Sequence, residues 1–383
     1  MQRLDESHDL MLNPPVFTGA PPSVGLAPQL SQWTPAASTL CIQTLDCHTA
    51  GEPLRIVTAG FPLLRGTTVL AQRQDCLRHH DALRQLLMFE PRGHADMYGC
   101  IITPAERPDS AFGVIFIHNE GYSTMCGHAM IALAKVAVES GAVAVTLPIS
   151  SFCVDAPCGQ VRLYAEVTAT GSGYQVGDSW FDNVPSFVDG PLRQTHLPGL
   201  GAVSYQLAYG GAYYAYVEAA TIGLSLAATN HRAIIAAGQQ IKQQINTELQ
   251  ISHPFAADLS FLYGVIFTGA ALTTETGGQP ATATADLRNV CVFADGELDR
   301  SPTGSGVSGL AAILHQRGEL QPAEILRVES ITGAVFQVSV LQSCSYGPHR
   351  AVIPRVRGQA FVTGRHQFFL DPHDQFPQGF IFR

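Results

Sequence analysis

Two helical stretches that are apolar on nearly every face constrain the fold of this chain most. The first follows residues 125–128 and ends at Gly141, and the second follows residues 302–305 and ends at Gly318. A glycine is the expected C-cap in both cases. A helix that is apolar all round must be surrounded by other structure, because a surface helix carries a polar face. The sequence therefore predicts two helices, each buried inside strands.

The rest of the chain is typical of short strands and turns. Its 383 residues include 36 glycines and 24 prolines, and only 14% are charged, against about 25% in an average globular protein. This composition argues against an all-helical bundle, and 46% apolar residues suffice for one large core or two ordinary ones. A third helix, with a polar outer face, is expected over residues 224–249. Strand-like runs lie at residues 40–45, 113–117, 143–147 and 160–168.

A weak internal repeat relates the two apolar helices. Alignment of Cys126 with Thr303 also places Gly127 with Gly304, and residues 133 and 134 with the identical pair at 310 and 311. Such a repeat suggests two similarly built halves, each with strands around one buried helix. Residues 1–38 are expected to form a flexible leader, and residues 273–285 an exposed loop between strands.

Charge and cysteine content exclude several classes of function. With a net charge of −9, the chain lacks the excess of positive charge that binding to nucleic acid requires. Nine cysteines without CxxC or zinc-like spacing argue against disulfides and a metal site, and favour a reducing, cytoplasmic location. The most apolar segment, residues 129–147, contains Lys135 and Glu139, so it is too polar to span a bilayer. No membrane or nucleic-acid partner is expected.

Cys126 has a physical reason to be reactive, because a helix start favours negative charge and lowers the pKa of a thiol. A small apolar filler is the alternative interpretation of such a cysteine. Gly127 permits a ligand to approach the backbone, and His128 adds a polar group. At the second helix start, residues 299–306, glycines around exposed first-turn amides would form a site for a carboxylate or a phosphate, although the same residues also suit an ordinary capped turn.

Four segments carry a family resemblance. Residues 46–55 (DCHTAGEPLR), 90–99 (EPRGHADMYG), 125–128 (MCGH) and 299–306 (DRSPTGSG) resemble, in order and spacing, the signature segments of the proline racemase family. The similarity runs from about residue 40 to the C-terminus. It implies an α+β fold like that of diaminopimelate epimerase, with two pseudo-symmetric halves that each place a curved sheet around a central helix.

The resemblance also implies a division of the chain and a place for the active site. Residues 39–190 together with 356–383 would form the first half, and residues 191–355 the second. The active site would lie in the cleft between them, where the two helices start. A homodimer is possible, since dimers are common in the family.

In racemases of this family a cysteine stands at each helix start. Here Cys126 matches the first position, whereas Thr303 occupies the second. A threonine hydroxyl does not lose its proton at neutral pH without a strong base, so racemisation by two thiols is not expected. The Cys and Thr combination resembles family members that dehydrate trans-3-hydroxy-L-proline to pyrroline-2-carboxylate, which predicts a hydro-lyase. The alternatives are a racemase or epimerase of proline or 4-hydroxyproline, and a non-catalytic binder of small amino acids.

Stereochemistry supports dehydration independently. In trans-3-hydroxyproline the α-hydrogen and the leaving hydroxyl share one ring face, so one residue could remove the proton and assist the departure of the hydroxyl. We expect Cys126 to have this role and Thr303 to close the pocket on the other face. No cofactor is expected, because bound charge and desolvation can acidify the α-carbon and no segment presents a Schiff-base lysine.

The family resemblance further implies which residues bind the substrate. Backbone amides of Gly127, His128, Gly304 and Ser305 would hold the carboxylate, while Asp299 and the His128 side chain would contact the ring nitrogen. Other polar residues of the matching segments are expected to have structural roles around the cleft: His48, Glu52, Arg55, His94 and Asp96.

Overall fold

A computed structural model describes residues 33–171, 173–272 and 285–382. The described residues from Leu40 onward form one compact unit, and residues 33–39 before it contain neither helix nor strand. The helices are α2 (Val69–His79), α3 (Asp81–Met88), α4 (Gly127–Glu139), α5 (His231–Glu248) and α6 (Gly304–Gln316), with short 3-10 turns at Ala219–Ile222, Ala228–Asn230 and Ala257–Leu259. The predicted leader (1–38) and loop (273–285) fall largely outside the described residues.

The strands are β1 (Leu40–Thr49), β2 (Glu52–Ala59), β3 (Tyr98–Thr103), β4 (Ser110–His118), β5 (Gly121–Ser123), β6 (Ile149–Ala156), β7 (Gly159–Thr170), β8 (Gly173–Asp182), β9 (Ser186–Val188), β10 (Arg193–Leu197), β11 (Gly201–Tyr209), β12 (Tyr213–Glu218), β13 (Leu262–Ala270), β14 (Leu287–Phe293), β15 (Glu297–Leu298), β16 (Leu326–Glu329), β17 (Val335–Tyr346), β18 (His349–Gly358) and β19 (Ala360–Leu370).

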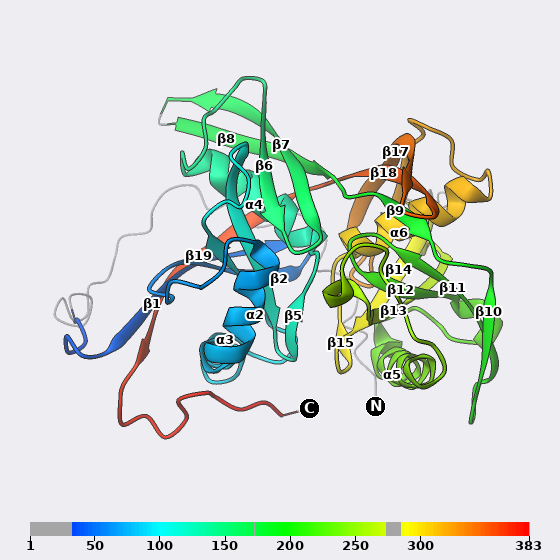
Figure 1. The fold of residues 1–383 in the computed structure, drawn as a ribbon, viewed down its shortest axis with the longest axis horizontal. Helices are drawn as coiled ribbons and strands as arrows, with labels where there is room; N and C mark the ends of the chain where they lie inside the picture. The colour runs from blue at the N-terminus through cyan, green and yellow to red at the C-terminus, as the bar shows by residue number, and fades with distance from the viewer. Residues whose placement is uncertain (1–32, 172, 273–284, 383) are drawn as a thin grey trace, which may run out of the picture. The chain divides into compact units, whose positions relative to one another are not determined.

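The first half of the fold is built around α4. Strand β1 pairs with β19 and β2, and the sheet continues through β3, β4, β6 and β7 to β8. Two of these pairings, β2 with β3 and β4 with β6, are parallel. Helix α4 contacts β1, β2, β7, β8 and β19, whereas α2 and α3 pack outside against β4. In Figure 1 the strands of this half curve around α4.

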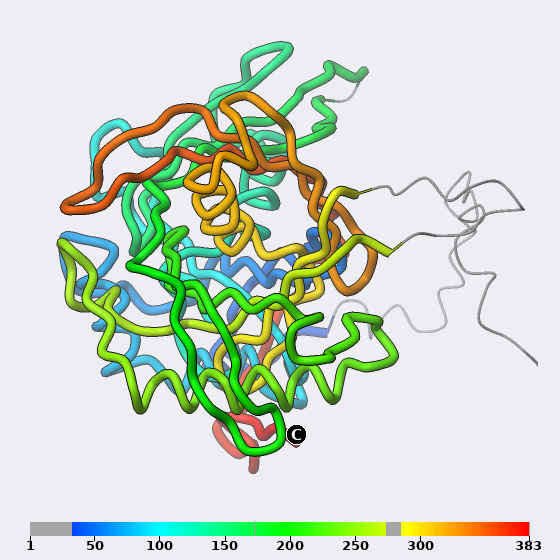
Figure 2. Tube along the Cα trace, turned by 90° about the vertical axis from the view of Figure 1, so that its right-hand side faces the viewer, coloured from blue at the N-terminus to red at the C-terminus, as the bar shows by residue number. Residues whose placement is uncertain are grey.

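The second half repeats this plan around α6. Strand β12 pairs in parallel with β13, and β14 with β16, and antiparallel pairs complete the sheet from β11 to β18. Strand β9 pairs with both β11 and β18 and so closes the sheet, although its residues fall within the segment predicted for the first half. Figure 2 shows α6, in yellow and orange, among these strands and α5, in yellow-green, at their outer side.

Burial explains why both central helices have no polar face. Every residue of α4 from Gly127 to Ala134 and every residue of α6 from Gly304 to Leu314 is buried, and both helices belong to one apolar core. The predicted α+β fold of two similar halves, each with strands around a central helix, is confirmed.

Within the described residues, no helix is both long enough and apolar enough to cross a bilayer.

Two of the predicted elements are wrong in extent or type. The third helix begins at His231 instead of residue 224, because Asn230 bonds back to the Ser225 carbonyl and the chain before it makes only a 3-10 turn. Residues 143–147 form no strand. Their backbone is held by the Ser150 hydroxyl, which bonds both the N–H and the carbonyl of Thr146. The other three strand-like runs lie in β1, β4 and β7.

Candidate active site

The starts of α4 and α6 meet backbone to backbone. A Cβ atom placed on Gly127 would lie 2.4 Å from the Cα of Gly304, and one placed on Gly304 would lie 2.6 Å from the Cα of Gly127. Only glycine fits at either position, because real Cβ contacts are not that short. The residues that precede these glycines, Cys126 and Thr303, are the N-caps of the two helices. The glycines thus bring both N-caps to one site.

One pocket is lined by side chains from both helix starts. Five of the residues predicted from the sequence line it: Cys126, His128, Asp299, Thr303 and Ser305. The first turn of a helix leaves its N–H groups without intrahelical acceptors, so the amides of both helix starts are available to an anion at the same place. The structure therefore brings the predicted residues together, and Gly127 and Gly304 form the backbone between them.

The Cys126 thiol is almost fully buried. Burial raises its pKa well above the usual range, and the nearby charge of Asp299 raises it further, whereas hydrogen bonds from the Ala129 N–H and the Tyr98 hydroxyl lower it. The sequence-based expectation of a lowered pKa is therefore wrong for this structure, because desolvation outweighs the helix start. The thiol is held in its protonated form at neutral pH.

His128 supplies a neutral partner for this thiol. Burial lowers the pKa of its imidazole to about 3, so the ring carries no charge at neutral pH. One ring nitrogen donates to the Pro53 carbonyl, which leaves the other nitrogen as an acceptor. The Cys126 Sγ lies 3.3 Å from Nδ1 and 3.6 Å from Nε2 of the ring. The imidazole can accept a hydrogen bond from the thiol, but its lowered pKa opposes transfer of the thiol proton to it.

Thr303 and Asp299 form the corresponding pair at the second helix. The Thr303 hydroxyl donates to Oδ2 of Asp299 over 2.7 Å, and Oδ1 accepts the Ser301 N–H over 2.7 Å. Burial raises the pKa of Asp299, although these hydrogen bonds lower it. Thr303 has φ +65° and ψ 91°, a conformation that is costly for a β-branched residue. The backbone is thus strained at the start of α6. It is not strained at the start of α4, where Cys126 has φ −143°.

Aromatic side chains that the sequence analysis did not single out complete the pocket. Tyr98, Tyr214, Tyr263 and Phe293 line it, and the Tyr214 hydroxyl lies 2.8 Å from the Ser305 Oγ. Only Tyr98 falls within a segment that the resemblance had marked. The other three lie on buried strands, where an aromatic residue is equally expected in a core, so nothing in the sequence distinguishes them.

The five residues expected to have structural roles do not line this pocket. Arg55 makes an ion pair with Asp46 at 2.9 Å and also bonds the Leu87 and Arg92 carbonyls. Asp96 pairs with Arg300 at 2.8 Å. The remaining three bond main-chain groups: His48 accepts the Gly51 N–H, Glu52 accepts the Arg300 N–H, and the His94 ring contacts the Ala95 carbonyl.

Comparison with known proteins agrees with this architecture. A relative from Colwellia psychrerythraea named trans-3-hydroxy-L-proline dehydratase is 49% identical over 360 residues, which cover 93% of this chain and 98% of the relative. A protein of the same name from Bacillus cereus is 43% identical over 343 residues, covering 88% and 97%. The crystal structure of a hydroxyproline epimerase from Agrobacterium vitis with bound trans-4-hydroxy-L-proline superposes with a TM-score of 0.80 at 28% identity, covering 90% and 96%.

The family profile described as proline racemase matches residues 44–381. The match includes both helix starts, the pocket between them and the strands that surround both helices. This chain belongs to the proline racemase family.

Proposed function

We propose that this protein is a hydro-lyase that dehydrates trans-3-hydroxy-L-proline to pyrroline-2-carboxylate. The observation that carries the proposal is the asymmetry of the pocket, which has a thiol, Cys126, at one helix start and a hydroxyl, Thr303, at the other. The relatives named trans-3-hydroxy-L-proline dehydratase support the choice of substrate.

The substrate carboxylate would lie between the two helix starts. Its oxygens would accept hydrogen bonds from the backbone amides of Gly127 and His128 on one side and of Gly304 and Ser305 on the other. The positive ends of two helix dipoles would then stabilise the charge that develops on the carboxylate when the α-proton leaves. Asp299 and the His128 ring would contact the ring nitrogen of the substrate.

Cys126 would serve both steps of the elimination. Its thiolate takes the α-proton, leaving the C–H electron pair on the α-carbon. That pair forms the C2–C3 double bond as the C3–O bond breaks, and the departing hydroxide leaves as water after it receives the proton held by Cys126. The enamine product tautomerises to the cyclic imine. Neither step requires a cofactor, since substrate and protein supply every proton and electron.

Thr303 would close the opposite face of the pocket. Its hydroxyl donates to Asp299 and has no strong base beside it, so it would not return a proton to the α-carbon. Racemisation would therefore lack its second acid. The proposal includes the division of the chain into a first half (39–190 with 356–383) that carries Cys126 and a second half (191–355) that carries Thr303.

The runner-up function is epimerisation of hydroxyproline, which the structural likeness to a hydroxyproline epimerase favours. The two are separated by incubating the protein with trans-3-hydroxy-L-proline, trans-4-hydroxy-L-proline and L-proline. We expect the cyclic imine, trapped with o-aminobenzaldehyde, from the first compound only. Chiral chromatography that finds D-configured products and no imine would establish epimerisation instead.

A non-catalytic binder would give neither product. In that case we would also expect no difference between the parent protein and Cys126→Ser in any turnover assay. Dehydration by the parent excludes this third function, while its absence with all three compounds overturns the proposal.

A further inference from the structure

One tight turn of the first half touches both helix starts. It comprises residues 49–52 between β1 and β2, and it is shaped by two left-handed residues, Ala50 at φ 55° and Gly51 at φ 86°. The Thr49 hydroxyl donates to the His128 carbonyl in the first turn of α4 over 2.9 Å. Glu52, three residues later, accepts the Arg300 N–H just before α6 over 2.7 Å. The 49–52 turn thus links two segments that lie far apart in sequence.

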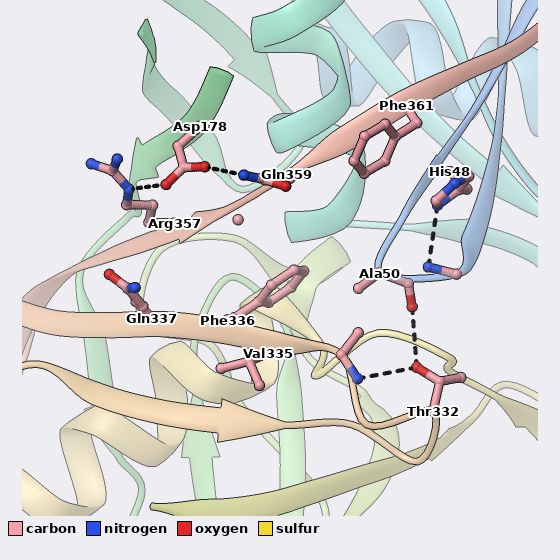
Figure 3. A pocket seen from close by; sticks show the side chains of 13 residues that line it. His48, Ala50, Asp178, Thr332, Val335, Phe336, Gln337, Arg357, Gln359 and Phe361 are labelled. Carbon is pink, nitrogen blue, oxygen red and sulfur yellow. Dashed lines mark hydrogen bonds and ion pairs between the residues drawn. The ribbon is translucent and has the colours of Figure 1, made fainter. Parts of the chain in front are cut away.

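A second contact fixes the outer side of the same turn. The Thr332 hydroxyl lies 3.4 Å from the Ala50 carbonyl and 3.1 Å from the Arg300 carbonyl, within bonding distance of both. Figure 3 shows Ala50 and Thr332 facing each other across the edge of a cavity that both residues line. The outer side of the turn therefore borders a cavity, while Glu52 on its inner side is fully buried.

Glu52 has unusual surroundings for a carboxyl group. It is 0% exposed, and its Oε1 has no hydrogen-bond partner among the described residues, whereas Oε2 is bonded to the Arg300 N–H. The charged groups around it are Asp299, Arg300 and Asp96, and Arg300 is itself paired with Asp96. A fully buried carboxyl that bonds one main-chain N–H and has no salt bridge of its own is costly, so a purely architectural role is a poor explanation.

The segment that Glu52 bonds requires external support. Residues 299–303, which we name the 299–303 turn, carry Asp299 and end in the strained Thr303. Strain of this kind costs about 1–3 kcal/mol and persists only where surrounding contacts hold it. Inside the second half, Asn289 holds the Pro302 carbonyl over 2.7 Å. From the first half, Glu52 holds the turn at the Arg300 N–H.

We propose that Glu52 is a positioning residue of the active site, which holds the 299–303 turn through the Arg300 N–H and thereby sets Asp299, Thr303 and the start of α6 against Cys126. The proposal rests on the proposed function for its effect on turnover. Its effect on the geometry of the 299–303 turn does not depend on the reaction. Glu52 acts through Arg300 and does not touch the substrate.

The test compares three substitutions of Glu52. Glu52→Gln keeps an acceptor oxygen for the Arg300 N–H at the same length, so kcat should stay within about threefold of the parent value. Glu52→Asp keeps the carboxyl but is one methylene too short, and Glu52→Leu keeps the volume but has no acceptor. Both should lower kcat about 100-fold, the scale expected when a catalytic group is displaced by about 1 Å.

Asp155 offers a matched control. It is also a fully buried carboxyl that accepts main-chain N–H groups, from Glu106 and Arg107, but it lies outside the pocket. Asp155→Ala should lower thermal stability and leave kcat within about threefold of the parent value. All variants are compared at a temperature at which each is folded by circular dichroism.

Hydrogen–deuterium exchange of residues 299–307 gives a readout that needs no turnover. In Glu52→Asp the amides of this segment should exchange at least about tenfold faster than in the parent, and in Glu52→Gln at the parent rate. An unchanged exchange rate and unchanged kcat in Glu52→Asp would overturn the proposal, as would equal losses in Glu52→Gln and Glu52→Leu. A parent protein that forms no imine would overturn the proposed function but leave the exchange result valid.

Discussion

The protonation state of Cys126 decides how this site responds to pH. The thiol lies at a helix start, which favours the thiolate, but it is also buried among aromatic side chains, which favours the neutral form. Burial is the larger effect and raises the pKa of Cys126. The neutral His128 beside it carries no charge to stabilise the thiolate.

The first prediction concerns the pH dependence of turnover. Since the thiolate is the base and the pKa of Cys126 is raised, only a small fraction of the free enzyme is active at pH 7. The value of kcat/KM should therefore rise with pH, about tenfold per unit, across the range from pH 6 to pH 8. Initial rates of imine formation across this range provide the measurement. A plateau below pH 7 would mean that the helix starts stabilise the thiolate more strongly than burial opposes it.

The second prediction concerns the residue opposite Cys126. Thr303→Cys places a second thiol at the start of α6, where it could donate a proton to the other face of the α-carbon. We expect slow formation of D-proline from L-proline, with incorporation of one deuterium at the α-carbon in deuterated water, followed by NMR and chiral chromatography. The parent should form no D-proline. If the variant catalyses neither inversion nor exchange, the two N-caps do not flank the substrate.

The predicted site residues that the structure brings together come from contiguous segments of the sequence. Cys126, His128, Asp299, Thr303 and Ser305 all fall in two short segments next to glycines, and all five line the pocket. Tyr214 and Tyr263 could not be identified, because their positions depend on strand pairings in the second half and not on neighbours in sequence. The pKa of Cys126 was mispredicted, since burial depends on the whole fold.

At the scale of elements, the contact between α4 and α6 is the feature on which the site depends. Each helix start approaches the other through a glycine, and the third prediction tests this contact. Gly127→Ala and Gly304→Ala should each destabilise the fold by about 1–3 kcal/mol and abolish most turnover, because the added Cβ forces the helix starts apart. Unfolding in denaturant and imine formation measure the two effects.

Gly177 in β8 is the matched control for these substitutions. A Cβ there would meet its nearest atom, Oε2 of Glu166, at 3.6 Å, which is an ordinary contact. Gly177→Ala should therefore change stability by less than about 0.5 kcal/mol and leave turnover unchanged. Equal stability of all three variants would show that the helix starts do not need to touch.

Element prediction was most reliable for the two central helices. The all-apolar composition of the two segments indicates buried helices, and the glycines after them indicate where the helices end. The observed helices α4 and α6 agree closely with these predicted helices. The start of α5 and residues 143–147 were mispredicted because side chains of Asn230 and Ser150 bond the local backbone, and such bonds depend on the conformation that they stabilise.

At the scale of the whole molecule, the two halves share one plan of strand pairings around a central helix. The weak repeat between residues 126 and 303 indicated this plan, but only the pairings show how each half joins strands that lie far apart in sequence: β19 pairs with β1, and β9 pairs with β18. Long-range pairing of this kind cannot be predicted from local pattern.

The fourth prediction is that a substrate analogue protects both halves at once. L-proline lacks the 3-hydroxyl and cannot be dehydrated. Saturating L-proline should slow hydrogen exchange both at residues 126–130 and at residues 303–307, because a shared ligand stabilises the bound form of both segments. Residues 193–197 of β10 do not line the pocket and should not respond. Protection confined to one of the two helix starts would contradict a site built from both halves.

The central claim is that Cys126 is the single acid and base of a dehydratase, and Cys126→Ser tests it most directly. The variant and the parent are incubated with trans-3-hydroxy-L-proline, and the cyclic imine is quantified, while binding of L-proline is measured by calorimetry. We expect no imine above background from the variant, with a Kd for L-proline within about threefold of the parent value. Imine formation by Cys126→Ser at a rate comparable to that of the parent would contradict it.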